Sequence, residues 1–200
     1  MRQNKAGLAL MMLGAALIAS ALLLFGWNRA EDENAGQQAA IMLQRVQETI
    51  PEKKMEPAKL TVTEIGGYEY IGYVSIPRLE VELPVMAGWD YDRLKIAPCR
   101  HFGSPESDDL VIAAHNYKNH FGRLARLKAE DVVLFSDMEG GSSTYAVRSV
   151  TRVEPTDMEA VQNSGYDLVL YTCAFSGDQR IIVGCERLAE DKTAPSGGDV

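Results

Sequence analysis

Residues 167–187 of the chain read DLVLYTCAFSGDQRIIVGCER. Its two ends, LVLYTC and RIIVGCER, are rich in apolar and β-branched residues, and the segment SGDQ between them consists of turn-forming or polar residues. The pattern predicts an antiparallel β-hairpin. Cys173 closes the first strand and Arg180 opens the second, so the hairpin is expected to bring the guanidinium close to the thiol.

Similar short runs occur along the preceding hundred residues. Together with the two strands of the hairpin, they predict strands at residues 68–76, 81–86, 109–114, 132–135, 145–153, 167–172 and 180–187. Helical patterns are brief, near residues 91–97 and 157–162, so repeated βαβ units with a parallel sheet are not expected. The sequence therefore predicts an all-β domain with short helices, arranged as a closed or nearly closed barrel or as a sandwich.

The beginning of the chain has a different composition. Residues 6–27 carry no charged side chain, and a helix of that length would be about 33 Å long, enough to cross the hydrocarbon core of a bilayer. A cleaved signal peptide is the alternative, although its apolar part is usually shorter, about 7 to 15 residues. Arg2 and Lys5 precede the stretch, and this modest positive bias predicts that the rest of the chain lies outside the cell.

These patterns give four expected parts. They are a cytoplasmic stub with a transmembrane anchor (1–29), a partly helical stalk (30–66), a catalytic β-barrel (67–189) and a flexible tail (190–200). Ile41, Leu43, Val46 and Ile50 are spaced loosely as one helical face. The stalk is therefore expected either to space the domain from the membrane or to pack on it.

Composition limits the class of protein. The chain is 46% hydrophobic and 24% charged, as in globular proteins, and its net charge of −8 argues against a broad nucleic-acid surface. Three cysteines are too few for a disulfide-stapled scaffold, so at least one thiol is free. Cys99 and Cys185 could form a disulfide, or both could be idle thiols.

The hairpin's cysteine and arginine suggest nucleophilic catalysis. A thiolate can attack an amide carbonyl, and a fixed guanidinium can stabilise both the thiolate and an oxyanion. The leaving amine needs a general acid, and His115 follows the apolar run LVIAA, so it has the same strand-end placement as Cys173. His101 and His120 are rivals that are expected to lie in loops. The alternative for Cys173 is a buried structural thiol.

The order AAHN, then YTC, then an arginine seven residues later resembles the sortase family. The similarity extends over residues 68–188, through IGYVSIPRLEVELPV, FGRLARLKAEDVV and EPTD. It implies a closed eight-stranded sortase-like β-barrel preceded by an N-terminal transmembrane helix. The short connection between residues 153 and 166 leaves no room for the long helix of class B sortases, and the subclass stays open.

The resemblance also implies the reaction. Cys173 would attack an LPXTG-like sorting motif in a secreted protein and form an acyl-thioester, with His115 moving protons and Arg180 steadying the oxyanion. The acceptor would be an amine of a peptidoglycan precursor or of a pilin, at the outer face of a Gram-positive cell membrane. The resemblance aligns Ala113, Thr172 and Ile182 with substrate-binding positions.

No cofactor is expected. Neither CxxC nor HxxxH occurs, which argues against structural zinc. Calcium is a further option, because relatives of this kind can bind it, at the acidic pairs Asp108 with Asp109 or Glu130 with Asp131. Two alternatives to the transpeptidase remain, namely another cell-wall thiol transpeptidase or hydrolase, and a membrane-tethered binding module without catalysis.

Overall fold

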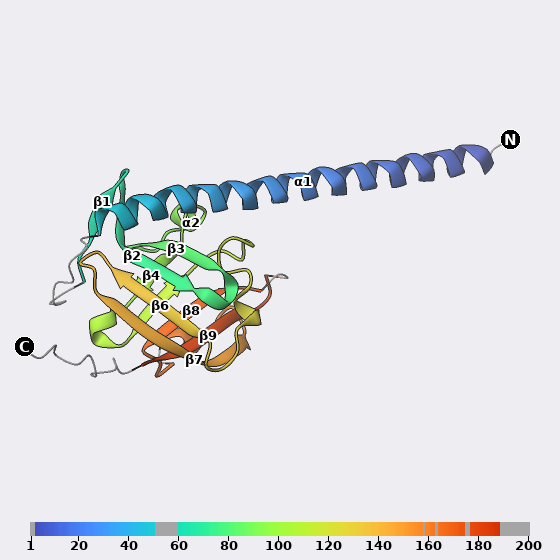
Figure 1. Ribbon diagram of the computed structural model, residues 1–200. Coiled ribbons are helices and arrows are strands. Elements are labelled where there is room, and N and C mark those ends of the chain that lie inside the picture. The colour runs from blue at the N-terminus through green and yellow to red at the C-terminus, as the bar shows by residue number, and fades with distance from the viewer. Residues whose placement is uncertain (1–2, 51–59, 158, 163, 175–176, 189–200) are drawn as a thin grey trace, which may run out of the picture. The chain divides into compact units, whose positions relative to one another are not determined.

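The computed structural model describes residues 3–50, 60–157, 159–162, 164–174 and 177–188, with side chains from residue 7 onward. Within these ranges one sheet contains nine strands (Figure 1). They are β1 (Thr63–Ile65), β2 (Tyr68–Ile76), β3 (Val81–Met86), β4 (Cys99–Phe102), β5 (Leu110–Ala113), β6 (Val132–Asp137), β7 (Ser142–Val153), β8 (Leu168–Cys173) and β9 (Arg180–Arg187). The helices are α1 (Gln3–Thr49), α2 (Tyr91–Leu94), α3 (Glu159–Gln162) and the 3-10 turns η1 (Pro77–Leu79), η2 (Pro105–Ser107) and η3 (Leu124–Arg126).

Eight of these strands close into a barrel. The sheet order is β1-β2-β3-β4-β5-β8-β9-β7-β6, and an additional antiparallel pairing of β2 with β6 closes the ring. Closure begins at Gly72, which pairs with Asp137 and follows a register shift in β2. A Cβ atom at Gly72 would lie 1.9 Å from the carbonyl oxygen of Ser136, so only glycine permits this approach. The closed eight-stranded barrel predicted from the sequence is therefore confirmed.

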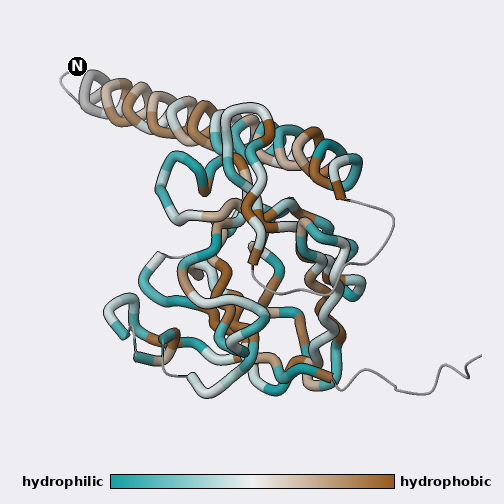
Figure 2. Tube along the Cα trace, turned by 90° about the vertical axis from the view of Figure 1, so that its left-hand side faces the viewer, coloured by the Kyte–Doolittle hydropathy of each residue, from teal (hydrophilic) through white to brown (hydrophobic). Residues whose placement is uncertain are grey.

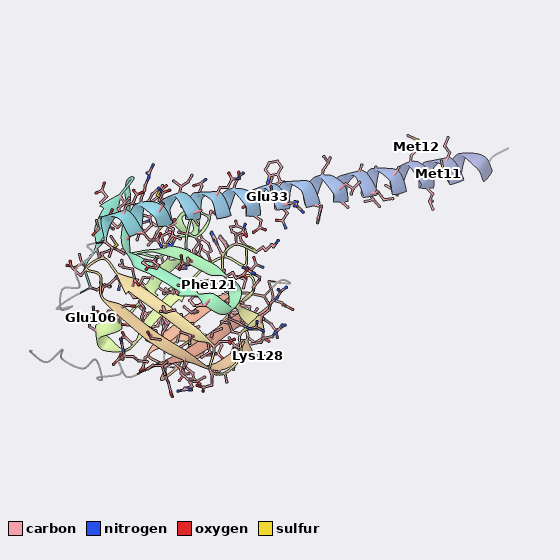
Figure 3. The ribbon with its side chains drawn as sticks, in the orientation of Figure 1. Met11, Met12, Glu33, Glu106, Phe121 and Lys128 are labelled. Carbon is pink, nitrogen blue, oxygen red and sulfur yellow. The ribbon has the colours of Figure 1, made fainter. Side chains whose placement is uncertain are left out.

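Alternating residues of the strands fill the barrel. Leu168 and Leu170 of β8 face inward, as do Ile181 and Val183 of β9, and all are buried in one apolar cluster. Phe121, from the connection between β5 and β6, is fully buried in the same cluster and is labelled within the barrel in Figure 3. Removal of this apolar surface from water stabilises the fold at about 25 cal/mol per Å².

One strand of the ring, β4, was not predicted from the sequence. The segment around His101 was expected to be a loop because it contains proline and glycine, yet residues Cys99–Phe102 form β4. This strand pairs antiparallel with β5 and parallel with β3, and its register shifts between Arg100 and Phe102. Partners on both sides hold β4 as a strand despite its short length and bulge.

In the first compact unit, Met1–Asn34, the described residues form the N-terminal part of helix α1. The helix contains a window with mean hydropathy 2.5, of which none is buried by the protein, and is long and apolar enough to cross a membrane. Figure 2 shows apolar residues in brown along this part of α1, and Figure 3 shows Met11 and Met12 projecting from it. Their exposed fractions of 70% and 67% are unusual for a surface in contact with water.

The second compact unit, Ala35–Val200, includes the C-terminal end of α1 together with the barrel. Ala35, Ala39 and Val46 follow one face of the helix and are buried, and Met42 and Ile50 are half-buried beside them. Val46 packs in a cluster with Tyr70 of β2 and Met86 of β3 on the outer side of the ring. This part of α1 therefore packs on the barrel.

Small residues let the helix approach the connection that follows β5. A Cβ atom at Gly36 would lie 2.5 Å from the Nδ2 atom and 2.9 Å from the Cβ atom of Asn119. These distances are shorter than real Cβ contacts, so a larger residue at position 36 would force the helix or the loop to move.

We expect the substitution Gly36→Leu to lower the free energy of unfolding of the barrel by about 1 to 3 kcal/mol, because the added side chain has no room. Gly26→Leu is the matched control, since nothing lies within 4 Å of a Cβ atom at that position of the same helix. Thermal unfolding of the full chain in detergent, followed by near-UV circular dichroism, measures both. Equal midpoints for the two variants would contradict the packing described here.

Candidate active site

The β8–β9 hairpin places a cysteine and an arginine side by side. Cys173 and Arg180 are directly paired across the two antiparallel strands. The Nη1 atom of Arg180 donates a hydrogen bond to the Cys173 sulfur at 3.2 Å. Both side chains are half-buried, and both lie on the outer side of the barrel because Thr172 and Ile181 between them alternate inward. The hairpin predicted from the sequence is thus confirmed, including its proximity of thiol and guanidinium.

His115 lies at the end of the strand next to β8. β5 and β8 are parallel, and their last backbone pair joins Ala113 to Tyr171. His115 and Cys173 each lie two residues after this pair in the sequence. The residues just before them are joined by a 2.8 Å hydrogen bond from the Thr172 hydroxyl to the carbonyl oxygen of Ala114. The register therefore brings the imidazole and the thiol to the same end of neighbouring strands.

Residues 115–122, which we call the histidine segment, form a tight connection after β5. The carbonyl oxygen of His115 accepts a hydrogen bond from the amide of Phe121 at 3.2 Å, and Phe121 is anchored in the core. The His115 ring packs against Tyr117, with ring centroids 4.9 Å apart. A Cβ atom at Gly122 would lie 2.4 Å from the carbonyl oxygen of Asn116, so the turn depends on glycine there.

Burial distinguishes the three thiols of the chain. All three cysteines are free, so the possible Cys99–Cys185 disulfide does not form in this structure. Cys185 faces the barrel interior, whereas Cys99 lies in the cluster on the outer side beneath α1. Burial raises the pKa of each of these two thiols to about 12, so both are protonated at neutral pH. Cys173 alone is half-exposed and hydrogen-bonded to a cation.

The other two histidines have different surroundings. His120 is completely buried, although it was predicted from the sequence to lie in a polar loop. His101 is on β4, and its Nδ1 atom lies 3.1 Å from the hydroxyl oxygen of Tyr171. Burial lowers the pKa of His101, so its ring is neutral at pH 7. Of the three histidines, His115 is the one that shares a strand end with Cys173.

Tyr171 was not singled out from the sequence, yet it neighbours the thiol. It lies two residues before Cys173 on the same side of β8, and this period-two spacing could have drawn attention to it. Burial raises the pKa of Tyr171 to about 12, while the nearby Arg180 acts to lower it. The hydroxyl group is therefore protonated throughout the physiological range. Trp89 and Phe102 pack around its partner His101.

The three predicted substrate-binding residues face two different ways. Ala113 and Ile182 lie in apolar clusters on the outer side of the ring, on either side of Tyr171, and their exposed fractions are only 2% and 3%. Thr172 faces the barrel interior, is 1% exposed and donates its hydroxyl hydrogen to Ala114. Its side chain therefore supports the junction of β5 with β8, and all three predicted substrate-binding side chains are almost fully covered by the protein in this structure.

The acidic pairs considered as calcium ligands have partners within the protein. Asp108 forms an ion pair with Arg187, and Glu130 forms one with Arg148. Asp109 accepts hydrogen bonds from the Ser104 amide and the Ser107 hydroxyl, and Asp131 accepts one from the Lys128 amide. Among the residues with described side chains, no group of three or more histidine, cysteine, aspartate or glutamate residues is placed to hold a metal ion.

Comparison with known proteins identifies the family. A family model described as the sortase domain matches residues 74–188, which is more than half of the chain. The chain belongs to the sortase family. The match includes β3 to β9, and therefore all three residues of the predicted catalytic trio.

Known sortases are similar to this chain in sequence and fold. Sortase A of Bacillus anthracis is 29% identical over 122 residues, which span 58% of this chain and 58% of that protein. The solved sortase C1 of Streptococcus suis is 28% identical, with a TM-score of 0.53 over 60% of this chain and 73% of that one. Sortase C of Streptococcus pneumoniae is 25% identical, with a TM-score of 0.54 over 80% and 89% of the two chains.

The difference in burial predicts selective alkylation of this sortase. At pH 8 fewer than about one in a thousand molecules carries a thiolate at Cys99 or Cys185, because a pKa near 12 lies far above that pH. We expect iodoacetamide to modify Cys173 in the folded protein and all three cysteines in urea, as read by peptide mass spectrometry. Modification of either buried thiol at a rate similar to that of Cys173 would contradict the assignment.

Proposed function

We propose that this sortase is a cysteine transpeptidase that cleaves a sorting motif in secreted proteins and transfers the acyl fragment to an amine. The observation that carries the proposal is the 3.2 Å hydrogen bond from Arg180 to the sulfur of Cys173, at the strand end next to His115. A thiol, a cation and an imidazole together supply the nucleophile, the charge stabilisation and the proton transfer that acyl transfer requires.

The first half of the reaction forms a thioester. The Cys173 thiolate attacks the carbonyl carbon of the scissile amide, and the oxygen gains negative charge in a tetrahedral intermediate. Arg180 has several N–H donors on a planar guanidinium, so it can bond the sulfur and then the oxyanion. The carbon–nitrogen bond then breaks as the protonated imidazole of His115 gives its proton to the leaving amine.

The second half transfers the acyl group. An incoming amine attacks the thioester carbonyl and gives up a proton to the now neutral His115. The carbon–sulfur bond breaks, and the Cys173 thiolate is restored beside Arg180. A new amide is formed, and the protons and charges balance without a metal or cofactor. Attack by water in place of the amine would give hydrolysis through the same thioester.

The substrate class follows from family membership and from the residues beside the thiol. We infer an LPXTG-like motif near the C-terminus of a secreted protein as the acyl donor. Tyr171 is half-buried on the outer side of β8, two residues before Cys173, and Ala113 and Ile182 are buried on either side of it, so its ring offers a partly apolar surface to an extended peptide. The acceptor is an amine of a peptidoglycan precursor or of a pilin. The similar sortase C of S. pneumoniae is described as having pilin substrates, which supports the second acceptor.

Helix α1 supports a location at the cell membrane. Its apolar part would span the bilayer once, with the barrel on the outer side, where secreted proteins and cell-wall precursors are found. The large apolar side chains of this part are exposed, for example Leu23 at 76% and Trp27 at 77%, and lipid would cover them.

The arginine gives the sharpest test of this function. We expect Arg180→Ala to reduce turnover of an LPXTG-type peptide with an amine acceptor by about a hundredfold to a thousandfold, the usual cost of removing one oxyanion donor. Arg180→Lys should recover only part of this loss, because an ammonium group keeps the charge but not the planar fork. Rates are measured on the full chain in detergent by chromatography of the peptide products.

Arg152→Ala is the matched control for this experiment. Arg152 is an exposed arginine on β7, the strand beside β9, and it neighbours Ile181 rather than Arg180. It should keep nearly full activity, and Cys173→Ala should have none. Full activity in Arg180→Ala, or an equal loss in Arg152→Ala, would reject the role proposed for Arg180.

A further inference from the structure

A side-chain hydrogen bond joins the residues that directly follow His115 and Cys173. The Nδ2 atom of Asn116 donates to the carbonyl oxygen of Ala174 at 3.3 Å, across 58 residues of sequence. Asn116 is half-buried, and Ala174 is 3% exposed. The bond therefore lies in a partly water-excluded place, where the loss of its donor would leave a carbonyl group less well satisfied.

This bond lies beyond the end of the regular sheet. The last backbone pair between β5 and β8 is Ala113 with Tyr171, so His115 lies two residues past the ladder. The Thr172 hydroxyl joins the strands just before His115 and Cys173, and Asn116 joins them just after. The imidazole and the thiol are thus bracketed on both sides by side chain to backbone hydrogen bonds.

Ala174 is a firm point of attachment. Its amide donates to the carbonyl oxygen of Gln179 at 2.8 Å, and its carbonyl oxygen also accepts from the amide of Gly177 at 2.9 Å. The residue after the nucleophile is therefore fixed by the hairpin connection. A bond from Asn116 to this residue ties the histidine segment to the same connection that holds Cys173 and Arg180 in register.

We propose that Asn116 is a positioning residue for His115, and that its hydrogen bond to Ala174 holds the imidazole beside Cys173 at the open end of β5. The proposal rests on the function proposed above, in which His115 protonates the leaving amine. Asn116 touches neither the sulfur nor the guanidinium through any hydrogen bond of the described residues. Its loss should affect proton transfer and leave the nucleophile in place.

Substrates with different leaving groups can distinguish a defect in proton transfer from a displaced nucleophile. A peptide with an amide at the cleavage site needs a proton from His115, whereas an analogue with a thioester at the same bond releases a thiolate that needs none. We expect Asn116→Ala to slow acylation by the amide peptide by about 10- to 100-fold, mainly in kcat, since small errors in position are costly. Acylation by the thioester analogue should change by less than about threefold, because it does not depend on the position of His115.

Two further variants test the hydrogen bond itself. Asn116→Asp has the same shape but cannot donate to Ala174 when ionised, so it should behave like Asn116→Ala. Asn116→Gln keeps the amide donor and should recover part of the activity. Asn119→Ala is the matched control, because Asn119 is an exposed asparagine of the same segment that faces Gly36 of α1 and not β8. It should leave both rates unchanged.

Backbone hydrogen exchange gives a readout that needs no substrate. The Phe121 amide donates to the His115 carbonyl, so a looser histidine segment should expose it. We expect this amide to exchange about tenfold faster in Asn116→Ala and Asn116→Asp than in the wild type and in Asn119→Ala, in the full chain in detergent. Equal exchange in all four proteins would overturn the positioning role, even if the wild type proved to transfer no peptide.

The rates with the amide and thioester peptides test the positioning role of Asn116 independently of hydrogen exchange. Wild-type amide cleavage with a selective loss in Asn116→Ala supports it. An equal loss with the amide and thioester peptides would overturn it, because that result indicates damage to Cys173 or Arg180. An equal loss in Asn119→Ala would also overturn it, because the loss of activity would then not depend on the hydrogen bond of Asn116. A wild type that cleaves no motif peptide would refute the transpeptidase function itself, while the exchange experiment still decides the role of Asn116.

Discussion

The site depends on the register between β8 and β9, which pairs Cys173 with Arg180 and allows the hydrogen bond between them. Side chains alternate along a strand, so a slip of either strand by one residue would turn its own group into the barrel and separate Cys173 from Arg180. The inward-facing residues of both strands, such as Leu170 and Val183, oppose this slip because it would turn them out of the apolar core and turn Tyr171 or Arg180 into it. The packing of the barrel interior thus fixes the positions of Cys173 and Arg180 on its outer side.

The three thiols have different surroundings within the same fold. Cys99 and Cys185 are enclosed by apolar side chains, which disfavour the thiolate and raise their pKa. Cys173 is at a strand end, half-exposed and bonded to a guanidinium. Nucleophiles require access and charge stabilisation together, and only this position has both. In the proposed reaction His115 is held at the same edge by contacts outside the regular sheet.

Much of the fold could be read from local patterns. The β8–β9 hairpin followed from two β-rich runs around a turn, and the closed barrel followed from the family resemblance. β4 was missed because its strand character comes from its partners, β3 and β5, and not from its proline- and glycine-rich surroundings. Closure between β2 and β6 has no local signal except the glycine at position 72.

The sequence predicts less of the candidate site than of the fold. Cys173 and Arg180 are close in sequence, so hairpin geometry could bring them together, and His115 repeats the placement of Cys173. The burial of His120 and the bond from Asn116 to Ala174 depend on segments far apart in the chain, so no local pattern predicts them. The inward orientation of Thr172 could have been anticipated, because it alternates with the outward-facing Cys173.

The proposed reaction passes through a covalent thioester on Cys173, and intact-mass spectrometry can detect this intermediate. The full chain in detergent is mixed with an LPXTG-type peptide and no amine acceptor, then quenched in acid. We expect a mass increase equal to the acyl fragment, located on Cys173 and removed by hydroxylamine. An adduct on Cys99 or Cys185, or turnover of the peptide in a Cys173→Ala variant, would contradict it.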